Sequence, residues 1–266
     1  MKNPILPIIM NCCGTDEVVT PEGFARQCPK EFELIDYVKN KRINRCYIIF
    51  YDSPEQNEFM NNLKVIFNFH AGSTITKVFE YHNNLIAISP LGAPAAANLM
   101  EEISVFGINE FIAIGSAGCL ESNIKEKLVL IDKAIRDEGT SYHYIEPSTY
   151  IETDNSLNRE IEQYLQKNNF DYIKATTWTN DAYYRETKQK IEMAKKLGAV
   201  AVEMECASWC AVAKFRKFKF AQLLYFSDLV NQDAWSRIAG QTTGYHYEKR
   251  DIVVTIVKNM IDNLKR

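Results

Sequence analysis

The sequence has no hydrophobic run of the roughly 20 residues that a membrane-spanning helix needs. It also has no stripe of Lys and Arg, and its formal net charge is −3, so neither nucleic acid nor an anionic membrane is favoured as a partner. The apolar stretch at 5–10 contains Pro7 and is too short for the hydrophobic region of a signal peptide. We therefore expect a soluble, cytoplasmic protein.

Recognisable disulfide and metal-binding patterns are missing as well. The chain has 7 cysteines, but no two have the CxxC spacing, and several lie in apolar segments. This usage indicates free thiols in a reducing compartment. No histidines have the spacing of a metal-ligand motif, so no metal is expected; the four stand at positions 70, 82, 143 and 246.

Linkers and internal repeats are absent too, and from residue 46 apolar runs alternate with helical patterns. The runs are rich in β-branched and aromatic residues, which predicts buried strands. The expected strands are 46–51, 85–91, 110–115, 127–135, 172–178, 199–204 and 220–227, and the expected helices are 54–67, 93–106, 155–168, 187–197, 205–217 and 247–265. This order predicts a single α/β domain over 1–266, with a mixed, largely parallel sheet flanked by helices.

The first 44 residues lack strong periodicity, and we expect them to form an N-terminal extension packed on the domain. Within them, Thr20-Pro21-Glu22 predicts a helix start, because a hydroxyl cap is followed by proline at the first helical position. A second helix cap is expected at Asp154 or Asn155.

Small and polar residues follow several predicted strands, at the point where each strand ends. Ligands of open α/β sheets bind outside the carboxyl ends of the strands, so we expect these residues to form one site. They are Gly92, Gly115 to Gly118, Tyr183 to Arg185, Glu203 to Glu205, and Asp228.

Two carboxylates stand at i and i+2 in Glu203-Met204-Glu205, where their side chains share one side of an extended segment. A buried carboxylate needs hydrogen-bond donors, and a vicinal diol offers two O–H groups, with Met204 covering the apolar side of the sugar. Alternatively, an acid here is stabilised by the dipole of the following helix, which explains Glu203 better than Glu205.

Three other features each have a functional and a structural interpretation. Asp228 ends an apolar run and is either a proton donor or a loop cap. Tyr183 and Tyr184 either form a flat surface that stacks on a base or simply pack. The small residues at 115–118 either let backbone N–H groups approach an anion or sugar, or permit a tight turn. Without GxGxxG or a Walker lysine, they do not support a dinucleotide or ATP site.

Taken together and in order, these segments resemble the nucleoside phosphorylase-I family, which includes purine nucleoside phosphorylases, uridine phosphorylases and methylthioadenosine/S-adenosylhomocysteine nucleosidases. The resemblance runs from about residue 46 to the end and rests on 110–120 (EFIAIGSAGCL), 137–144 (DEGTSYHY), 180–186 (NDAYYRE), 198–213 (GAVAVEMECASWCAVA) and 224–228 (LYFSD). It is greatest to the uridine-phosphorylase-like branch. It implies a pentosyltransferase that cleaves an N-glycosidic bond through an oxocarbenium-like transition state.

The resemblance also implies roles for residues at matching positions. They are Asp228 as the catalytic acid; Glu205, Met204 and Glu203 for ribose; Tyr183, Tyr184 and Arg185 for the base; Ser116, Gly115 and Gly92 on the phosphate or nucleophile side; and His143 and Arg136 as further candidates.

Two positions depart from the phosphorylase pattern. Gln56, in DSPEQ at 52–56, stands where the Gly-Asp-Pro-x-Arg motif has arginine, and Ala113 stands where a second arginine is usual. Arginine is the natural partner of phosphate, and Arg136 or Arg185 is a candidate substitute.

From this resemblance we expect a purine or uridine-type nucleoside as substrate and phosphate as co-substrate and nucleophile, with no other cofactor. The protein is expected to be a homo-oligomer, either a dimer or a hexamer. A nucleosidase that uses water, and a nucleoside-binding protein with a weakened phosphate site, are the alternatives.

Overall fold

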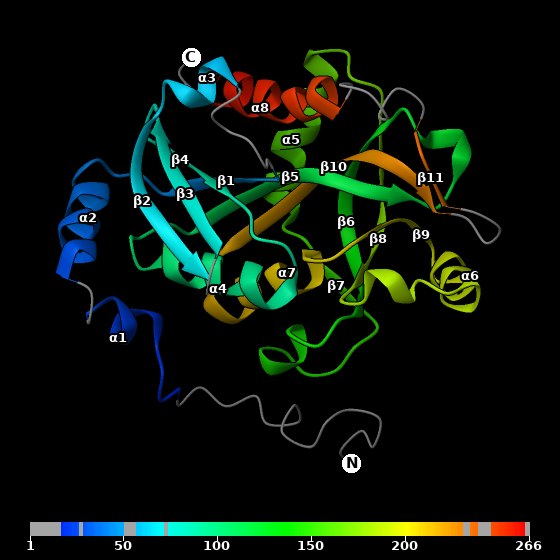
Figure 1. The fold of residues 1–266 in the computed structure, drawn as a ribbon, viewed down its shortest axis with the longest axis horizontal. Coiled ribbons are helices and arrows are strands. Elements are labelled where there is room, and N and C mark those ends of the chain that lie inside the picture. The colour runs from blue at the N-terminus through cyan, green and yellow to red at the C-terminus, as the bar shows by residue number, and fades with distance from the viewer. Residues whose placement is uncertain are drawn as a thin grey trace.

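The computed structural model describes residues 17–26, 29–50, 57–71, 74–230, 235–238 and 246–263. Figure 1 shows its mixed sheet with helices on both sides. The strands are β1 (Arg45–Ile49), β2 (Lys64–Ala71), β3 (Thr74–Tyr81), β4 (Asn84–Ile88), β5 (Glu110–Cys119), β6 (Leu128–Asp137), β7 (Tyr150–Glu152), β8 (Tyr172–Asn180), β9 (Ala199–Glu203), β10 (Lys219–Val230) and β11 (Trp235–Arg237). The helices are α1 (Pro21–Ala25), α2 (Pro29–Asn40), α3 (Glu58–Asn61), α4 (Ala93–Ser104), α5 (Asn155–Lys167), α6 (Lys188–Lys196), α7 (Cys206–Arg216) and α8 (His246–Asn263), with short 3₁₀ turns η3 (Ser122–Ile124), η4 (Ser141–His143) and η5 (Tyr183–Arg185).

The strands form one sheet in the order β11-β10-β6-β8-β9-β5-β1-β4-β3-β2, with β7 paired to β6. An additional parallel pairing joins β10 to β5, so β5, β10, β6, β8 and β9 close into a ring of paired strands. The carboxyl ends of four of these strands meet there: Gly118 lies opposite both Asp228 and Val202, and Thr179 lies opposite Glu203. The register therefore brings the ends of β5, β8, β9 and β10 together, as expected for a ligand site.

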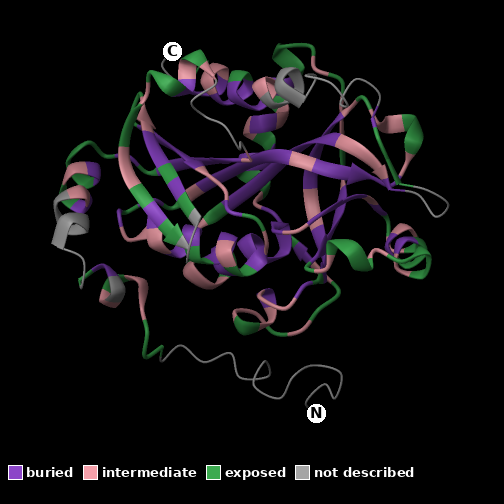
Figure 2. Cartoon of the chain, in the orientation of Figure 1, coloured by how far each residue is buried: buried purple, intermediate pink, exposed green. Residues whose placement is uncertain are grey.

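Two hydrophobic layers hold the helices against the sheet. α5 and α8 bury Ile161 and Val257 against one face, whereas α4 and α7 bury Met100 and Trp209 against the other. Burial is nearly continuous along the central strands and α7 (Figure 2). The apolar runs read from the sequence are therefore the core of a mixed α/β domain, which confirms the predicted fold class.

Local capping explains where several helices begin. The Asp154 carboxylate accepts hydrogen bonds from the backbone N–H groups of Ser156 and Leu157 and so caps α5, as predicted. The predicted start near residue 20 is also present, because the Thr20 hydroxyl accepts from Gly23 N at 2.9 Å at the beginning of α1. No described helix is long and apolar enough to cross a membrane.

The helix predicted over 54–67 is wrong for its described part. Only α3 is helical there, and residues 64–71 form β2, which pairs antiparallel with β3. β3 in turn pairs with β4, and both β2 and β3 are rich in the β-branched and aromatic residues that favour strands. The strands β2, β3, β7 and β11 and the helix α2 are additions to the elements predicted from the sequence.

Candidate active site

Glu205 lies at the junction of β9 and α7, where it is 3% exposed. One carboxylate oxygen accepts a hydrogen bond from Gly92 N at 2.6 Å, and the other accepts from Met204 N at 3.3 Å. Gly92 can present its N–H here because its φ of 93° is in a region that glycine adopts without strain. The chain thus brings the loop before α4 and the end of β9 together around one carboxylate.

The carboxylate of Glu203, two residues earlier, is surrounded by hydrogen-bond donors from the protein itself. One carboxylate oxygen accepts from the hydroxyls of Thr179 and Thr177 at 2.6 and 3.4 Å, and the other accepts from Glu205 N and Cys206 N at 2.8 and 2.7 Å. A carboxylate has about four acceptor positions, and all are used here. Glu203 thus joins the start of α7 to β8 and β9, and its predicted contact with ribose stays a prediction.

The two neighbouring carboxylates perturb each other. Burial, together with the nearby charge of Glu203, raises the pKa of Glu205 to about 8. Burial also raises the pKa of Glu203, although hydrogen bonds from Thr179, from the backbone of Glu205 and Cys206, and from Gln222 oppose the effect. Asp181, which follows β8 and accepts from Gly139 N at 2.7 Å, adds to the negative charge that Glu205 experiences.

The small residues predicted as a loop at 115–118 are instead part of β5. A Cβ on Gly115 would lie 2.3 Å from the ring of Phe50, so this glycine is required for packing. The adjacent Ser116 is only partly buried, and its hydroxyl interacts with the hydroxyl of Tyr225. Ser116 therefore stays a candidate for the nucleophile side, whereas Gly115 has a structural reason to be small.

Asp228 lies near the end of β10 and is oriented by two donors. The Ser227 hydroxyl donates to one carboxylate oxygen at 2.6 Å, and the indole N–H of Trp235 donates to the other at 2.9 Å. Asp228 is in register with Gly118, where a Cβ would lie 2.6 Å from Val230 and 2.8 Å from Val202, so this glycine lets the ends of β9 and β10 pack closely beside Asp228. Its predicted role as a proton donor remains a prediction.

The three residues predicted to face the base lie on η5, beyond the end of β8. Tyr183 is 44% exposed and Tyr184 is 92% exposed, and their rings meet edge-on at 4.8 Å between centroids. They do not form the flat double surface that the sequence suggested. Arg185 is exposed on the same turn. Tyr183 is thus the better placed of the three, because Asp228 is close enough to affect its pKa.

Glu186, directly after this turn, was not among the predicted site residues. It is half-buried, and its pKa is raised to about 7 by burial and by the charge of Asp228, against the opposing effects of Asn180 and Lys190. An isolated acid before a helix has no sequence signature, so only its tertiary surroundings identify it.

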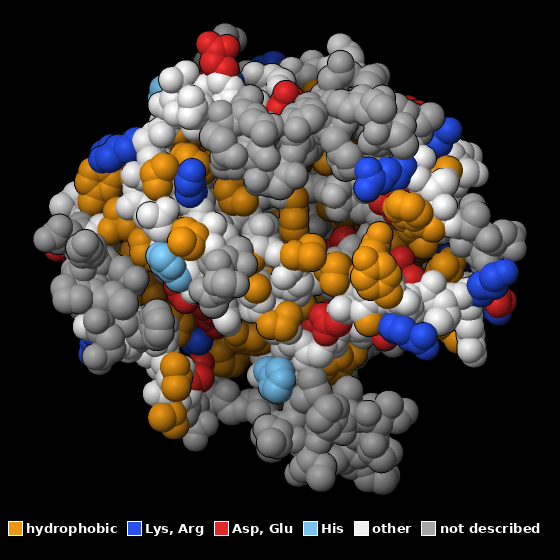
Figure 3. Space-filling view, in the orientation of Figure 1, with side chains coloured by type: hydrophobic (Ala, Val, Ile, Leu, Met, Phe, Trp, Pro, Cys, Tyr) orange, Lys and Arg blue, Asp and Glu red, His pale blue; other side chains and the backbone are white. Residues whose placement is uncertain are grey.

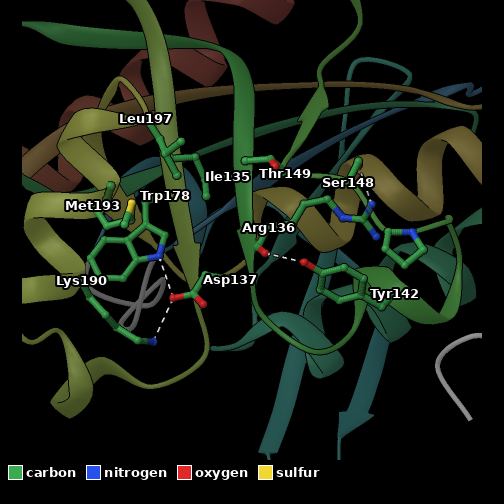
Figure 4. A pocket seen from close by; sticks show the side chains of 12 residues that line it. Ile135, Arg136, Asp137, Tyr142, Ser148, Thr149, Trp178, Lys190, Met193 and Leu197 are labelled. Carbon is green, nitrogen blue, oxygen red and sulfur yellow. Dashed lines mark hydrogen bonds and ion pairs between the residues drawn. The ribbon is translucent and has the colours of Figure 1, made fainter. Parts of the chain in front are cut away.

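Arg136, near the end of β6, is bonded to the segment that follows this strand, and its role as a phosphate ligand stays a prediction. Its guanidinium donates to the hydroxyls of Ser141 and Ser148 and to the backbone carbonyls of Ile145 and Glu146, at 2.7–3.0 Å. It borders a cavity of about 560 Å³, shown in Figure 4. The other residues labelled there, including Trp178 and Lys190 with their shared partner Asp137, are not among the predicted site residues.

His143 ends η4 and lines a different cavity of about 550 Å³, with Glu101 and Arg216. Among the described residues, it makes no hydrogen bond to Glu205 or Asp228, so the structure does not join it to the acidic site. Gln56 lies outside the described residues. Ala113 is fully buried in the core, where it contacts no ligand space.

Acidic groups dominate the site within the described ranges. Neither Lys nor Arg is bonded there to Glu203, Glu205 or Asp228, and no group of three or more His, Cys, Asp or Glu residues could hold a metal ion. On the face in Figure 3, acidic side chains lie among hydrophobic ones. Such a site suits a neutral ligand with hydroxyl and N–H donors better than an anion.

The fold and this arrangement define a mixed α/β protein with a candidate ligand site at the carboxyl ends of its strands. A model of the phosphorylase superfamily matches residues 51–253, and the chain belongs to this family. The prediction of this family from the sequence is confirmed, while the closer likeness to the uridine phosphorylases stays a prediction.

Relatives with known names are similar over much of the chain. A DeoD-type purine nucleoside phosphorylase of Mycoplasma genitalium is 27% identical over 188 residues, covering 67% of this chain and 78% of the relative. A guanosine phosphorylase of Halorubrum lacusprofundi is 26% identical over 130 residues, which are 48% of this chain and 54% of that protein. In three dimensions, the futalosine hydrolase of Helicobacter pylori aligns with a TM-score of 0.67 at 19% identity, over 84% of this chain and 99% of that chain.

Proposed function

We propose that this chain cleaves the N-glycosidic bond of a purine nucleoside and that Glu205 holds the ribose diol. One observation carries the proposal: within the described residues, Glu205 accepts two backbone hydrogen bonds, whereas the neighbouring Glu203 accepts four hydrogen bonds. Two acceptor positions therefore remain on a buried carboxylate, and the 2′- and 3′-hydroxyls of a ribose would supply two donors. The exposed side of Met204 would lie against the sugar.

The diol would also change the protonation of Glu205. Its pKa of about 8 keeps the carboxyl largely protonated in the free protein at neutral pH. Two O–H donors favour the ionised form, and the resulting negative charge stabilises the positive charge that develops on the sugar as the bond breaks.

Asp228 is proposed as the group that assists departure of the base. A purine leaves more readily when its N7 is protonated, and a carboxylic acid can deliver that proton as the C1′–N9 bond breaks. The bonding electrons then go to the base, and Asp228 becomes a carboxylate that accepts from Ser227 and Trp235. Tyr183 would contact the face of the base.

Water is the acceptor that we favour. The described part of the site is acidic, Arg136 is engaged elsewhere, and Ala113 is buried in the core. The segment 51–56 reads YDSPEQ and contributes no Lys or Arg to the sequence at the position of the phosphorylase arginine motif. An anionic phosphate would be repelled by the carboxylates of Glu205 and Asp228, whereas neutral water would not; within the described residues, Arg237 lies opposite Asp228 on β11 and is a cation that could reduce this repulsion.

Phosphorolysis is the second candidate, and the two named relatives favour it, since both are phosphorylases. A cation from a second subunit could then complete the anion site.

The test of the proposed function is base release from a panel of purine and pyrimidine nucleosides, followed by chromatography. Release from purine nucleosides supports the proposal, and release from uridine alone contradicts the purine assignment. Saturable binding without any base release would instead support a nucleoside-binding protein.

A further inference from the structure

Glu205 occupies the N-cap position of α7, but its own side chain makes no capping hydrogen bond to this helix. Its carboxylate oxygens accept instead from Gly92 N and Met204 N. The first backbone N–H groups of a helix have no partner within the helix, and a side chain at the N-cap position usually provides one. The acceptors for the first turn of α7 must therefore come from other residues.

Thr179 and Glu203 supply these acceptors. Glu203 accepts from Cys206 N at 2.7 Å, and the Thr179 hydroxyl accepts from Ala207 N at 3.0 Å. The same hydroxyl donates its proton to the Glu203 carboxylate at 2.6 Å. Thr179 and Glu203 are cross-strand neighbours on β8 and β9, and both are buried. A single hydroxyl group thus connects β8 with the end of β9 and with the first turn of α7.

This network holds the backbone of Glu205 and leaves its side chain out of the capping. The Glu205 N–H donates at 2.8 Å to the Glu203 oxygen that Thr179 does not contact. The Glu205 carbonyl accepts from the Ser208 hydroxyl at 2.8 Å and from Trp209 N at 3.1 Å. The direction in which the Glu205 carboxylate points therefore depends on Thr179, because Thr179 fixes the carboxylate to which the Glu205 N–H is bonded.

We propose that Thr179 is a positioning residue that holds Glu205 in the orientation in which its carboxylate meets the ribose diol. This inference rests on the proposed function. Without the hydroxyl, the buried Glu203 carboxylate loses a donor and Ala207 N loses its acceptor, and buried groups without partners are costly enough for the junction to rearrange. A displacement of about 1 Å in a binding group can cost about 10²-fold in rate.

The experiment measures kcat/KM for adenosine or inosine, whichever is cleaved faster, and for its 2′-deoxy counterpart. The ribonucleoside offers Glu205 two hydroxyls and the deoxynucleoside offers one, so the ratio of the two kcat/KM values reports how well Glu205 engages the diol. The fraction of folded protein cancels within this ratio. The intrinsic lability of the two glycosidic bonds cancels when a variant is compared with the wild type.

Thr179→Val is the diagnostic variant, because it removes the hydroxyl and keeps the shape of the side chain. Its kcat/KM for the ribonucleoside should fall about 10- to 100-fold. Its ribonucleoside-to-deoxynucleoside ratio should fall about 10-fold, because a hydrogen bond between the second hydroxyl and a charged group is lost. Thr179→Ala, which puts no methyl group in place of the hydroxyl, should give the same result. Thr179→Ser retains the hydroxyl and should keep the wild-type ratio.

Thr177→Val is the matched control. Thr177 lies two residues earlier on β8 and is equally buried, but its hydroxyl is 3.4 Å from the Glu203 carboxylate. The same loss of a buried hydroxyl at this position should keep the wild-type ratio. Glu205→Gln is the reference variant, and it should lower the ratio as Thr179→Val does.

The outcomes separate this inference from the proposed function. If Thr179→Val lowers both kcat/KM values in equal proportion, Thr179 has a structural role alone, and the inference is overturned while the proposed function stands. An equal fall of the ratio in Thr177→Val or in Thr179→Ser also overturns it. An unchanged ratio in Glu205→Gln contradicts the ribose anchor itself. If the wild type cleaves neither nucleoside, the proposed function fails and the inference fails with it.

Discussion

Replacing Glu205 with Gln tests the ribose anchor because it keeps the shape of the side chain and removes its charge. The amide oxygen can still accept from Gly92 N, now 2.6 Å from the carboxylate. It cannot offer the charge-assisted acceptors that we assign to the diol, and hydrogen bonds to a charged group contribute roughly 1.5–3 kcal/mol. The expected loss in kcat/KM is therefore about 10- to 150-fold.

The same substitution should not weaken the fold. In the unfolded chain Glu205 ionises near about pH 4.3, whereas in the folded protein its pKa is raised to about 8. A folded-state pKa above the unfolded value means that stability falls as the pH rises between those two values. Gln removes this effect, so the thermal midpoint of Glu205→Gln should equal or exceed that of the wild type at neutral pH, and the difference should grow toward pH 8.

The assay is steady-state cleavage of a purine nucleoside across pH, paired with thermal unfolding. Glu203→Gln is the matched control: its amide oxygen can accept from Glu205 N and Cys206 N while its NH₂ group donates to Thr179, so most activity should remain. A lowered midpoint with unchanged kinetics in Glu205→Gln would refute the reasoning and make Glu205 a structural acid. Equal activity losses in both variants would refute the division of roles between the two acids.

Other residues give independent predictions. Asp228→Asn should slow cleavage of natural purine nucleosides by about 10²- to 10⁴-fold but slow 7-methylguanosine, whose N7 is already cationic, much less; equal losses would exclude it as the acid. Glu203→Ala should lower the free energy of unfolding by about 1–3 kcal/mol because buried donors lose their acceptor, as measured by denaturant unfolding; an unchanged value would mean that Glu203 does not anchor α7. Trp235 is 53% exposed and bonded to Asp228, so base binding should change its fluorescence, and Trp235→Phe should abolish that signal. Gly115→Ala should destabilise the fold, since its Cβ would lie 2.3 Å from Phe50, and wild-type stability would show that the ring can move aside.

The sequence predicts secondary structure best where a run of apolar residues becomes a buried element of the fold. The apolar runs that become β5 and β10 predict the central strands, and Asp154 caps α5 as its residue type indicates. In contrast, β2 and β3 were missed although both are rich in β-branched and aromatic residues; β2 pairs with β3, and β3 pairs with β4.

The sequence predicts where the candidate site lies, but it does not predict which of the acidic residues there is free to bind a ligand and which supports the fold. Strand ends supplied Glu205 and Asp228, because the carboxyl ends of the strands meet. The sequence places Glu203 and Glu205 side by side, but it does not show that Thr177 and Thr179 on β8, together with two backbone N–H groups, donate to Glu203. Glu186 becomes notable only because the fold buries it beside Asp228.

The central claim is that this chain hydrolyses a purine nucleoside with water as the acceptor. The most direct measurement incubates the protein with adenosine or inosine in phosphate-free buffer and again with added phosphate, and resolves free ribose from ribose 1-phosphate by NMR. We predict free base and free ribose without phosphate, at a rate that added phosphate does not raise. Base release that requires phosphate and yields ribose 1-phosphate, or no base release at all, would contradict the account.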